Sequence, residues 1–383
     1  MGLSTFQILV EDSWHTLVFA FSGIVLFYYF MRSRKDYAYF INLFEQDFVK
    51  ASKVLEKTDD LALKKDLILQ GREDLAERTY LELKDLLINN NFAYQCFKEL
   101  NTGTVEEKIS SCQVLAILNT PKAIDYCITA LYDENISVRK EVINLLATKA
   151  DLKIINTLIN YLEYCDNQSL LKDLTTAFEE IGNKAFKQLK NVLLTHRPAV
   201  KIWAIRVLNS IELKETQSKE LFQLYLNLVD NSATEIKLEV IHGLEELAEI
   251  DENAVFAKLN EKLSADEWKV RAEAAKAIGN SSFVKGSSKL YQLVDDSHPM
   301  VRKNAFYSLV KLGYEGIKFL IKAAHNSKYS KEAIEVLDDL DTEFLVEAII
   351  KIYDTDNEQE KRLAKNLLQT KLERKTNNLK VIG

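Results

Sequence analysis

The chain has 383 residues, of which only 11 are glycine and 3 are proline. Sheet proteins need such turn residues at every strand reversal, so this composition excludes a sandwich, a barrel or a doubly wound sheet. Because 47% of the residues are hydrophobic, a disordered chain is excluded, and the net charge of −7 lacks the basic surplus of nucleic-acid-binding proteins. The expected fold class is all-α.

The first element in chain order is an uncharged segment, residues 13–31, without Asp, Glu, Lys or Arg. As a helix it would be about 28 Å long, close to the thickness of a hydrocarbon core. Arg32, Arg34 and Lys35 follow it, and no basic residue precedes it. This asymmetry predicts a transmembrane helix and a single-pass protein of the cell membrane. Its N-terminus, residues 1–12, would lie outside the cell and the rest in the cytoplasm.

Residues 32–104 are expected to form juxtamembrane helices and an N-terminal cap. Within them, six residues recur at steps of three and four, as on one face of a helix: Tyr37, Phe40, Ile41, Phe44, Phe48 and Val49. Such an aromatic stripe could contact lipid or a partner. We expect it instead to cover the end of the domain that follows.

Residues 105–372 repeat themselves with a period near 31. One column of small or apolar residues comprises Ser111, Val142, Leu174, Ala204, Val240, Ala274, Ala305, Ala333 and Ala364. A second column, four residues later, comprises Leu115, Leu146, Phe178, Leu208, Leu244, Ile278, Leu309, Leu337 and Leu368. Two short helices per repeat predict an α-solenoid of about nine repeats, whose neighbours stack to bury one continuous core. The remaining residues, 373–383, are expected to be a polar tail.

Three segments carry a family resemblance: LYDENISVRKEVINLL, LSADEWKVRAEAAKAIG and LVDDSHPMVRKNAFYSLVKLG. Each has Leu, then Asp, then Val-Arg, then Ala or Val, then Leu. This pattern resembles the short HEAT-like repeat of bacterial proteins, which is also seen in phycobilin lyases. The resemblance extends over residues 105 to about 372 and implies a HEAT-like fold. It implies little about activity, because the matching positions are packing positions.

A basic column lies three residues before the small column and comprises Lys108, Arg139, Lys201, Lys237, Arg271, Arg302 and Lys361. Aspartates precede several of these residues, at Asp133, Asp230, Asp266 and Asp295. In HEAT-like proteins such pairs join successive repeats by hydrogen bonds, and we expect that role here. A basic groove for phosphate is the alternative.

Enzymes with HEAT-like repeats were compared with the chain motif by motif. The deoxyhypusine hydroxylase class holds iron with His-Glu pairs, and none of the five histidines here is followed by Glu. The alkylpurine DNA glycosylase class needs a basic DNA groove, which an acidic chain does not offer, although Trp203 and Trp268 could serve as its aromatic residues. Bilin lyase activity is not excluded by motif. We expect no catalytic residue, metal site, cofactor or small-molecule substrate.

The expected binding surface is a row of residues five positions after the basic column. At 100° per residue, this row points almost directly away from the core. It comprises Gln113, Asn144, Thr176, Arg206, His242, Lys276, Tyr307, Glu335 and Asn366. In HEAT-like folds the second helix of each repeat lines the concave side. A solvated face is the alternative to a binding surface, but Arg, Tyr and Trp are enriched at binding hot spots.

The central stretch of this row contributes the candidate protein-binding residues, namely Arg206, His242, Lys276 and Tyr307, with Trp203 on the flank. The predicted function is that of a membrane-tethered HEAT-repeat scaffold or adaptor that binds a protein partner. Two alternatives remain open. One is a HEAT-fold enzyme or enzyme subunit of lyase-like type, and the other an accessory subunit of a membrane complex for polysaccharide synthesis or transport.

Overall fold

The computed structural model describes residues 34–352 except 166, together with 358, 361, 362, 364–366, 368 and 369. The regular elements among these residues are all helices, as the composition predicted. Contacts between the helices divide the chain into two compact units, which meet between Ile181 and Gly182.

Unit 1 begins with a helix at 34–46 and continues through ten α-helices and one 3-10 helix with assigned bounds. These are α2 (Phe48–Glu56), α3 (Leu61–Leu69), α4 (Gly71–Asp74), α5 (Glu77–Asn89), α6 (Phe92–Thr102), α7 (Val105–Leu118), α8 (Pro121–Thr129), η1 (Ala130–Tyr132), α9 (Ile136–Ala147), α10 (Leu152–Leu162) and α11 (Gln168–Ile181).

Unit 2 continues the same alternation of helices. Its elements are η2 (Gly182–Ala185), α12 (Phe186–Thr195), α13 (Pro198–Ser210), α14 (Glu215–Asn231), α15 (Thr234–Glu246), α16 (Glu252–Lys262), α17 (Trp268–Asn280), η3 (Val284–Gly286), α18 (Ser287–Leu293), α19 (Pro299–Lys311), α20 (Gly313–Asn326), α21 (Ser330–Asp339) and α22 (Thr342–Ile352).

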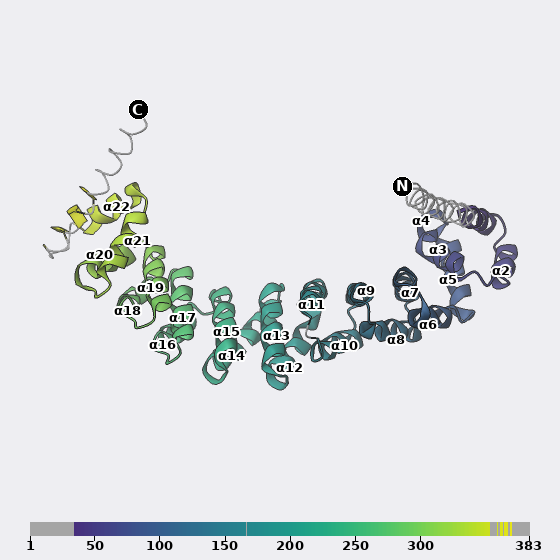
Figure 1. Ribbon diagram of the computed structural model, residues 1–383, viewed down its shortest axis with the longest axis horizontal. Helices are drawn as coiled ribbons and strands as arrows, with labels where there is room; N and C mark the ends of the chain where they lie inside the picture. Colours follow the sequence, from purple (N-terminus) through teal and green to yellow (C-terminus); the bar gives the residue numbers. More distant parts are fainter. Residues whose placement is uncertain are drawn as a thin grey trace, which may run out of the picture. The chain divides into compact units, whose positions relative to one another are not determined.

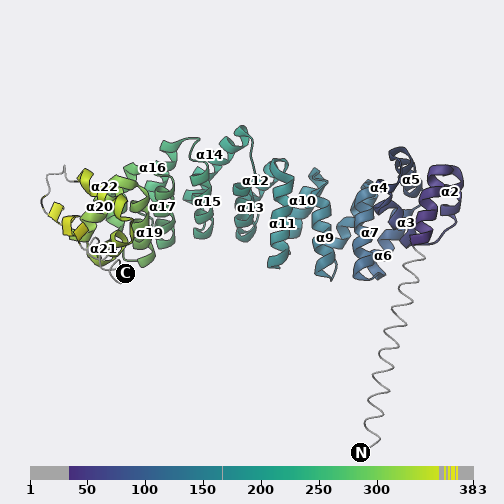
Figure 2. The same cartoon turned by 90° about the horizontal axis from the view of Figure 1, so that it is seen from above.

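The helices of the repeats form two layers within each unit (Figures 1 and 2). In unit 1, α7, α9 and α11 pack in one layer, and α8 and α10 lie in the other. In unit 2, α13, α15, α17, α19 and α21 pack successively in what we call the odd layer. The even layer of unit 2 contains α12, α14, α16, α18 and α20.

All three prolines of the chain mark helix starts. Pro121, Pro198 and Pro299 each occupy the first turn of α8, α13 and α19. At that position the missing N–H is not needed and the fixed φ already suits a helix. The low proline count therefore reflects long helical stretches with few breaks.

Burial confirms the repeat register. All nine residues of the small column are fully buried, from Ser111 to Ala364. The large column is buried from Leu115 to Leu337 and only half-buried at Leu368. The two columns thus face the interior between successive repeats, as the period of the sequence predicted.

The aromatic stripe before the repeats packs inside unit 1. Phe40 and Phe44 are both buried, and their rings lie 6.1 Å apart. Tyr37 donates a hydrogen bond of 2.5 Å from its hydroxyl to Asp74 in α4. Phe40 and Phe44 are thus shielded from water, whereas Val49 of the same stripe is 62% exposed. The role of the stripe as a cap stays a prediction.

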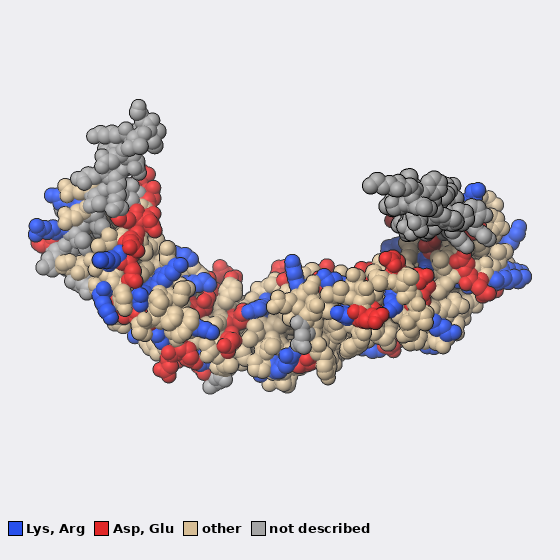
Figure 3. All heavy atoms as spheres, viewed as in Figure 1, with Lys and Arg blue, Asp and Glu red and all other residues tan. Residues whose placement is uncertain are grey.

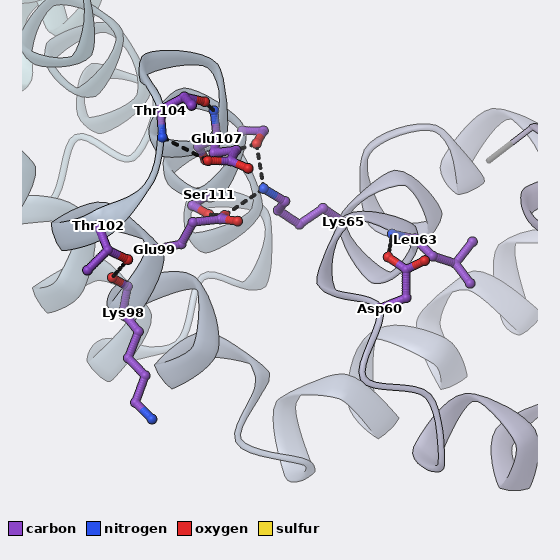
Figure 4. A network of polar contacts seen from close by, with 10 residues as sticks. Asp60, Leu63, Lys65, Lys98, Glu99, Thr102, Thr104, Glu107 and Ser111 are labelled. Carbon is purple, nitrogen blue, oxygen red and sulfur yellow. Dashed lines mark hydrogen bonds and ion pairs between the residues drawn. The ribbon is translucent and has the colours of Figure 1, made fainter. Parts of the chain in front are cut away.

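A buried polar network joins this cap to the first repeat (Figure 4). The Lys65 ammonium on α3 lies 2.6 Å from a Glu99 carboxylate oxygen on α6 and 2.9 Å from the Ser110 hydroxyl. Ser111 on α7 donates to the same Glu99 oxygen. The Lys65 side chain is only 6% exposed, so the pair is shielded from water and holds the three helices together. This network explains why a polar residue occupies the first position of the small column.

The predicted localisation at the cell membrane is contradicted by the helices. No helix of the described part of the chain is long and apolar enough to cross a membrane. A spanning helix needs about 20 mostly apolar residues, whereas the longest helix given above, α14, has 17 and carries charges such as Glu215 and Lys219. Residues 13–31, on which the prediction of a transmembrane helix rested, lie outside the described residues. Single-pass localisation and membrane tethering are therefore not retained.

Candidate protein-binding surface

Four of the five predicted binding residues are exposed on consecutive helices of the odd layer. Arg206 lies on α13, His242 on α15, Lys276 on α17 and Tyr307 on α19. These helices pack side by side in unit 2 (Figures 1 and 2). Each of the four residues follows its small-column neighbour by two positions, so the buried column fixes the direction in which the row points. We call these four residues the central row.

The fifth predicted binding residue, Trp203, is buried and not exposed. Its side chain is only 8% exposed on α13, so it does not offer an open indole to a partner. Trp203 lies about 95° around the helix from the centre of the core-facing stripe. A large side chain at that angle points along the seam between helices, and α12 and α15 both pack against α13. The sequence period predicts the direction of the Trp203 side chain around its helix, but not its burial by neighbouring helices.

The charges of the central row are balanced by nearby carboxylates. The guanidinium of Arg206 donates a hydrogen bond of 2.9 Å from Nε to Glu239 on the next odd helix. Lys276 lies 2.9 Å from Glu273 on its own helix, and this hydrogen bond raises the pKa of the ammonium. Both pairs are partly exposed and remain available to a competing carboxylate. Figure 3 shows basic and acidic side chains interspersed over this view of the described surface.

The aromatic end of the row borders a small cavity. It measures about 220 Å³ and opens between α19 and α21, where Tyr307, Lys303, Phe306 and Glu335 are among its lining residues. Tyr307 is 50% exposed, and the Lys303 ammonium lies 5.9 Å from the centre of its ring. The cavity thus combines an aromatic wall with charged groups of both signs.

The position of this cavity follows from how the neighbouring helices pack. At the preceding seam, α17 approaches α19 so closely that a Cβ on Gly279 would come within 2.5 Å of the Ser308 hydroxyl oxygen. At the next seam, Phe306 of α19 and Val336 of α21 line the cavity. Glu335 belongs to the predicted row, but Lys303 and Phe306 were not predicted, because the period of the sequence does not distinguish closely packed seams from open ones.

The basic column joins successive repeats, as the resemblance implied. Lys108 lies 2.8 Å from Asp133, and Lys237 lies 3.3 Å from Glu267 of the following repeat. Arg271 makes two hydrogen bonds, of 2.8 and 3.0 Å, to the two carboxylate oxygens of Asp296. Arg271 also donates to the backbone carbonyl oxygens of Ala265 and Asp266. Because these cations are paired with carboxylates of the chain itself, they do not form a phosphate groove.

Two details of that prediction were wrong. Asp230 pairs with Lys258 and Lys262 of α16, which do not belong to the basic column. Asp295 was expected to pair with the basic column, but Asp296 takes Arg271, while Asp295 accepts hydrogen bonds from the hydroxyl of Ser327 and the backbone N–H of Lys328. The two aspartates are adjacent, and only the turn before α19 decides which one faces Arg271.

The described residues offer little for other chemistry. Within the part of the chain that the structure describes, no three His, Cys, Asp or Glu side chains are grouped to hold a metal ion. Cys96 lies beside the Lys65–Glu99 pair, but burial raises the pKa of its thiol to about 12. A thiol with that pKa is protonated at neutral pH and is a poor nucleophile. This cluster is structural.

Comparison with known proteins identifies the repeat type. The family described as HEAT repeats matches residues 256–338, which include α17, α18 and α19. These residues form HEAT-like repeats. No curated protein matches the chain.

Several solved structures resemble the chain. A crystal structure of an engineered protein is 17% identical, covers 84% of this chain and 98% of its own, and has a TM-score of 0.36. Kap121p bound to Pho4p is 12% identical, covers 89% of this chain and 45% of its own, and has a TM-score of 0.47. Kap95p, from a structure with RanGDP, is 11% identical, with coverages of 89% and 57% and a TM-score of 0.41. The chain thus spans less than half of the Kap121p chain that it matches.

Proposed function

We propose that this chain is a non-enzymatic scaffold or adaptor that binds a protein partner on the odd layer of unit 2. The observation that carries this proposal is the central row itself, in which four exposed side chains of different chemistry occur on consecutive packed helices. A stack of repeats holds such side chains at fixed spacing, which suits the recognition of an extended protein surface.

The chemistry of the row supports a protein partner. Interfaces combine a few aromatic or arginine anchors with a polar rim, and Tyr307 and Arg206 provide such anchors at the two ends of the row. The cavity beside Tyr307, at about 220 Å³, is smaller than the usual 300–1,000 Å³ of small-molecule sites and suits a single large side chain.

The proposal is tested by removing both anchors at once. The full chain and its Arg206→Ala, Tyr307→Ala variant are used as bait in extracts of the source cells, and recovered proteins are quantified by mass spectrometry. A matched control removes two exposed apolar side chains of the even-layer side, Leu194→Ala with Val284→Ala. We expect at least one specific partner to fall about tenfold with the row variant and to be retained by the control.

Equal recovery of every partner by both variants, with helix content unchanged in circular dichroism, would place the binding surface elsewhere. A partner lost only with the even-layer control would reverse the assignment of the two layers.

A further inference from the structure

A separate hollow lies in unit 1, away from the central row. It measures about 630 Å³ and is lined by residues of α3, α4, α5 and α7 and of the turn after α9. Three cations reach it from three different segments: Arg72 on α4, Lys84 on α5 and Lys149 after α9. A single carboxylate, Glu77, is among the lining residues. The hollow is therefore locally basic in a chain whose net charge is −7.

These three cations differ from those between the repeats. Lys108, Lys153 and Arg271 each pair with a carboxylate of another helix or of a turn between helices. In the described part of the chain, Arg72, Lys84 and Lys149 have no side-chain ion pair or hydrogen bond. An anionic ligand in the hollow would have these three cations around it, none of which is engaged in an ion pair among the described residues.

The apolar part of the lining narrows the class of ligand. Leu81 is 51% exposed at the hollow, and Ile117 lines it from α7. A free phosphate or similar small anion would leave these aliphatic groups in water. A protein segment that carries carboxylates and aliphatic side chains would cover them and neutralise the cations together. A hollow of this size accommodates a few residues of such a segment.

We propose that this hollow of unit 1 docks an acidic, leucine-containing segment of a partner protein, held by Arg72, Lys84 and Lys149 around the apolar surface of Leu81. This site is independent of the central row. A partner could occupy either one alone.

The test uses the full chain and a fluorescent synthetic peptide built only from Asp, Glu and Leu, with binding followed by anisotropy at about 0.15 M salt. The variant Lys84→Glu, Lys149→Glu removes two of the three cations. The control Lys98→Glu, Lys122→Glu reverses two exposed lysines elsewhere in unit 1. Each double variant changes the net charge from −7 to −11, so general repulsion affects both equally. We expect binding to weaken at least tenfold in the first variant and less than twofold in the control.

Two further measurements distinguish a peptide ligand from a simple anion. Leu81→Asp should also weaken binding of the peptide, and a tenfold molar excess of inorganic phosphate over the peptide should not displace it. The proposal is overturned if the unaltered chain does not bind the peptide, if both double variants weaken binding equally, or if an Asn, Gln and Leu version binds as tightly. Displacement by phosphate, or full binding by Leu81→Asp, would instead assign the hollow to a simple anion and would equally contradict a peptide site.

Discussion

Ala305 lies fully buried on α19, which packs against α17 and α20. It belongs to the small column, where a short side chain lets neighbouring repeats approach. Ala305→Leu would force extra carbon atoms into a filled seam. We expect the free energy of unfolding to fall by about 1–3 kcal/mol, measured by urea unfolding.

Asn144→Leu is the control for this substitution, because Asn144 is exposed on α9 at a row position. There the same side chain has room, and the expected change is within about 0.5 kcal/mol. An Ala305→Leu protein as stable as the unaltered chain would mean that the repeat register is wrong.

The period of the sequence predicts the burial of some individual residues but not of others. It predicted that Ala305 is buried and Tyr307 exposed, because both properties depend on the angle around one helix. It did not predict the burial of Trp203, which depends on side chains of neighbouring helices, or the choice between Asp295 and Asp296, which depends on the path of one turn.

Between elements, the Arg271–Asp296 pair joins α17 to the turn before α19. Burial by itself would raise the pKa of Asp296. The hydrogen bonds from Arg271 and from the backbone N–H of His298 more than offset this and bring the pKa below its usual value. A carboxyl whose pKa is lowered by folding adds stability above its unfolded pKa of about 3.9. That stability is lost as the pH falls through the folded-state pKa.

Asp296→Asn tests this directly, since asparagine cannot ionise. At pH 7 we expect the variant to be less stable by about 1.5–3 kcal/mol, because a charged hydrogen-bonded pair is lost. The difference should be constant above about pH 5 and should shrink below about pH 4, as the unaltered Asp296 becomes protonated. Denaturant unfolding at a series of pH values measures it. A difference that grows on acidification would contradict the assigned direction of the pKa.

At the level of elements, the repeats were predictable, but the polar contacts that join them to the preceding helices were not. The repeat helices present the same buried columns at a period near 31, so each one supports the assignment of the others. The network of Lys65, Glu99 and Ser111 occurs once, joins residues from three helices and has no period. For the same reason, the basic hollow was not predicted, because its three cations come from separate segments.

For the whole molecule, the described residues form two candidate binding surfaces in different units, the central row in unit 2 and the basic hollow in unit 1. The row was found from the sequence because it repeats with the core, on the opposite side of each helix. Which partner it binds is not encoded in that pattern, because exposed positions are free of the packing rules that define the repeat. The partner must be found by experiment.

Site-directed photo-crosslinking in the source cells tests the binding surface most directly. A photo-crosslinking amino acid replaces Tyr307 on the odd layer or, as the matched control, Leu194, which is exposed on α12 of the even layer. We predict a discrete protein adduct from position 307 that disappears when Arg206→Ala is added, and no such adduct from position 194. An adduct formed from position 194 alone, or formed equally from both positions, would contradict a partner bound on the odd layer of unit 2.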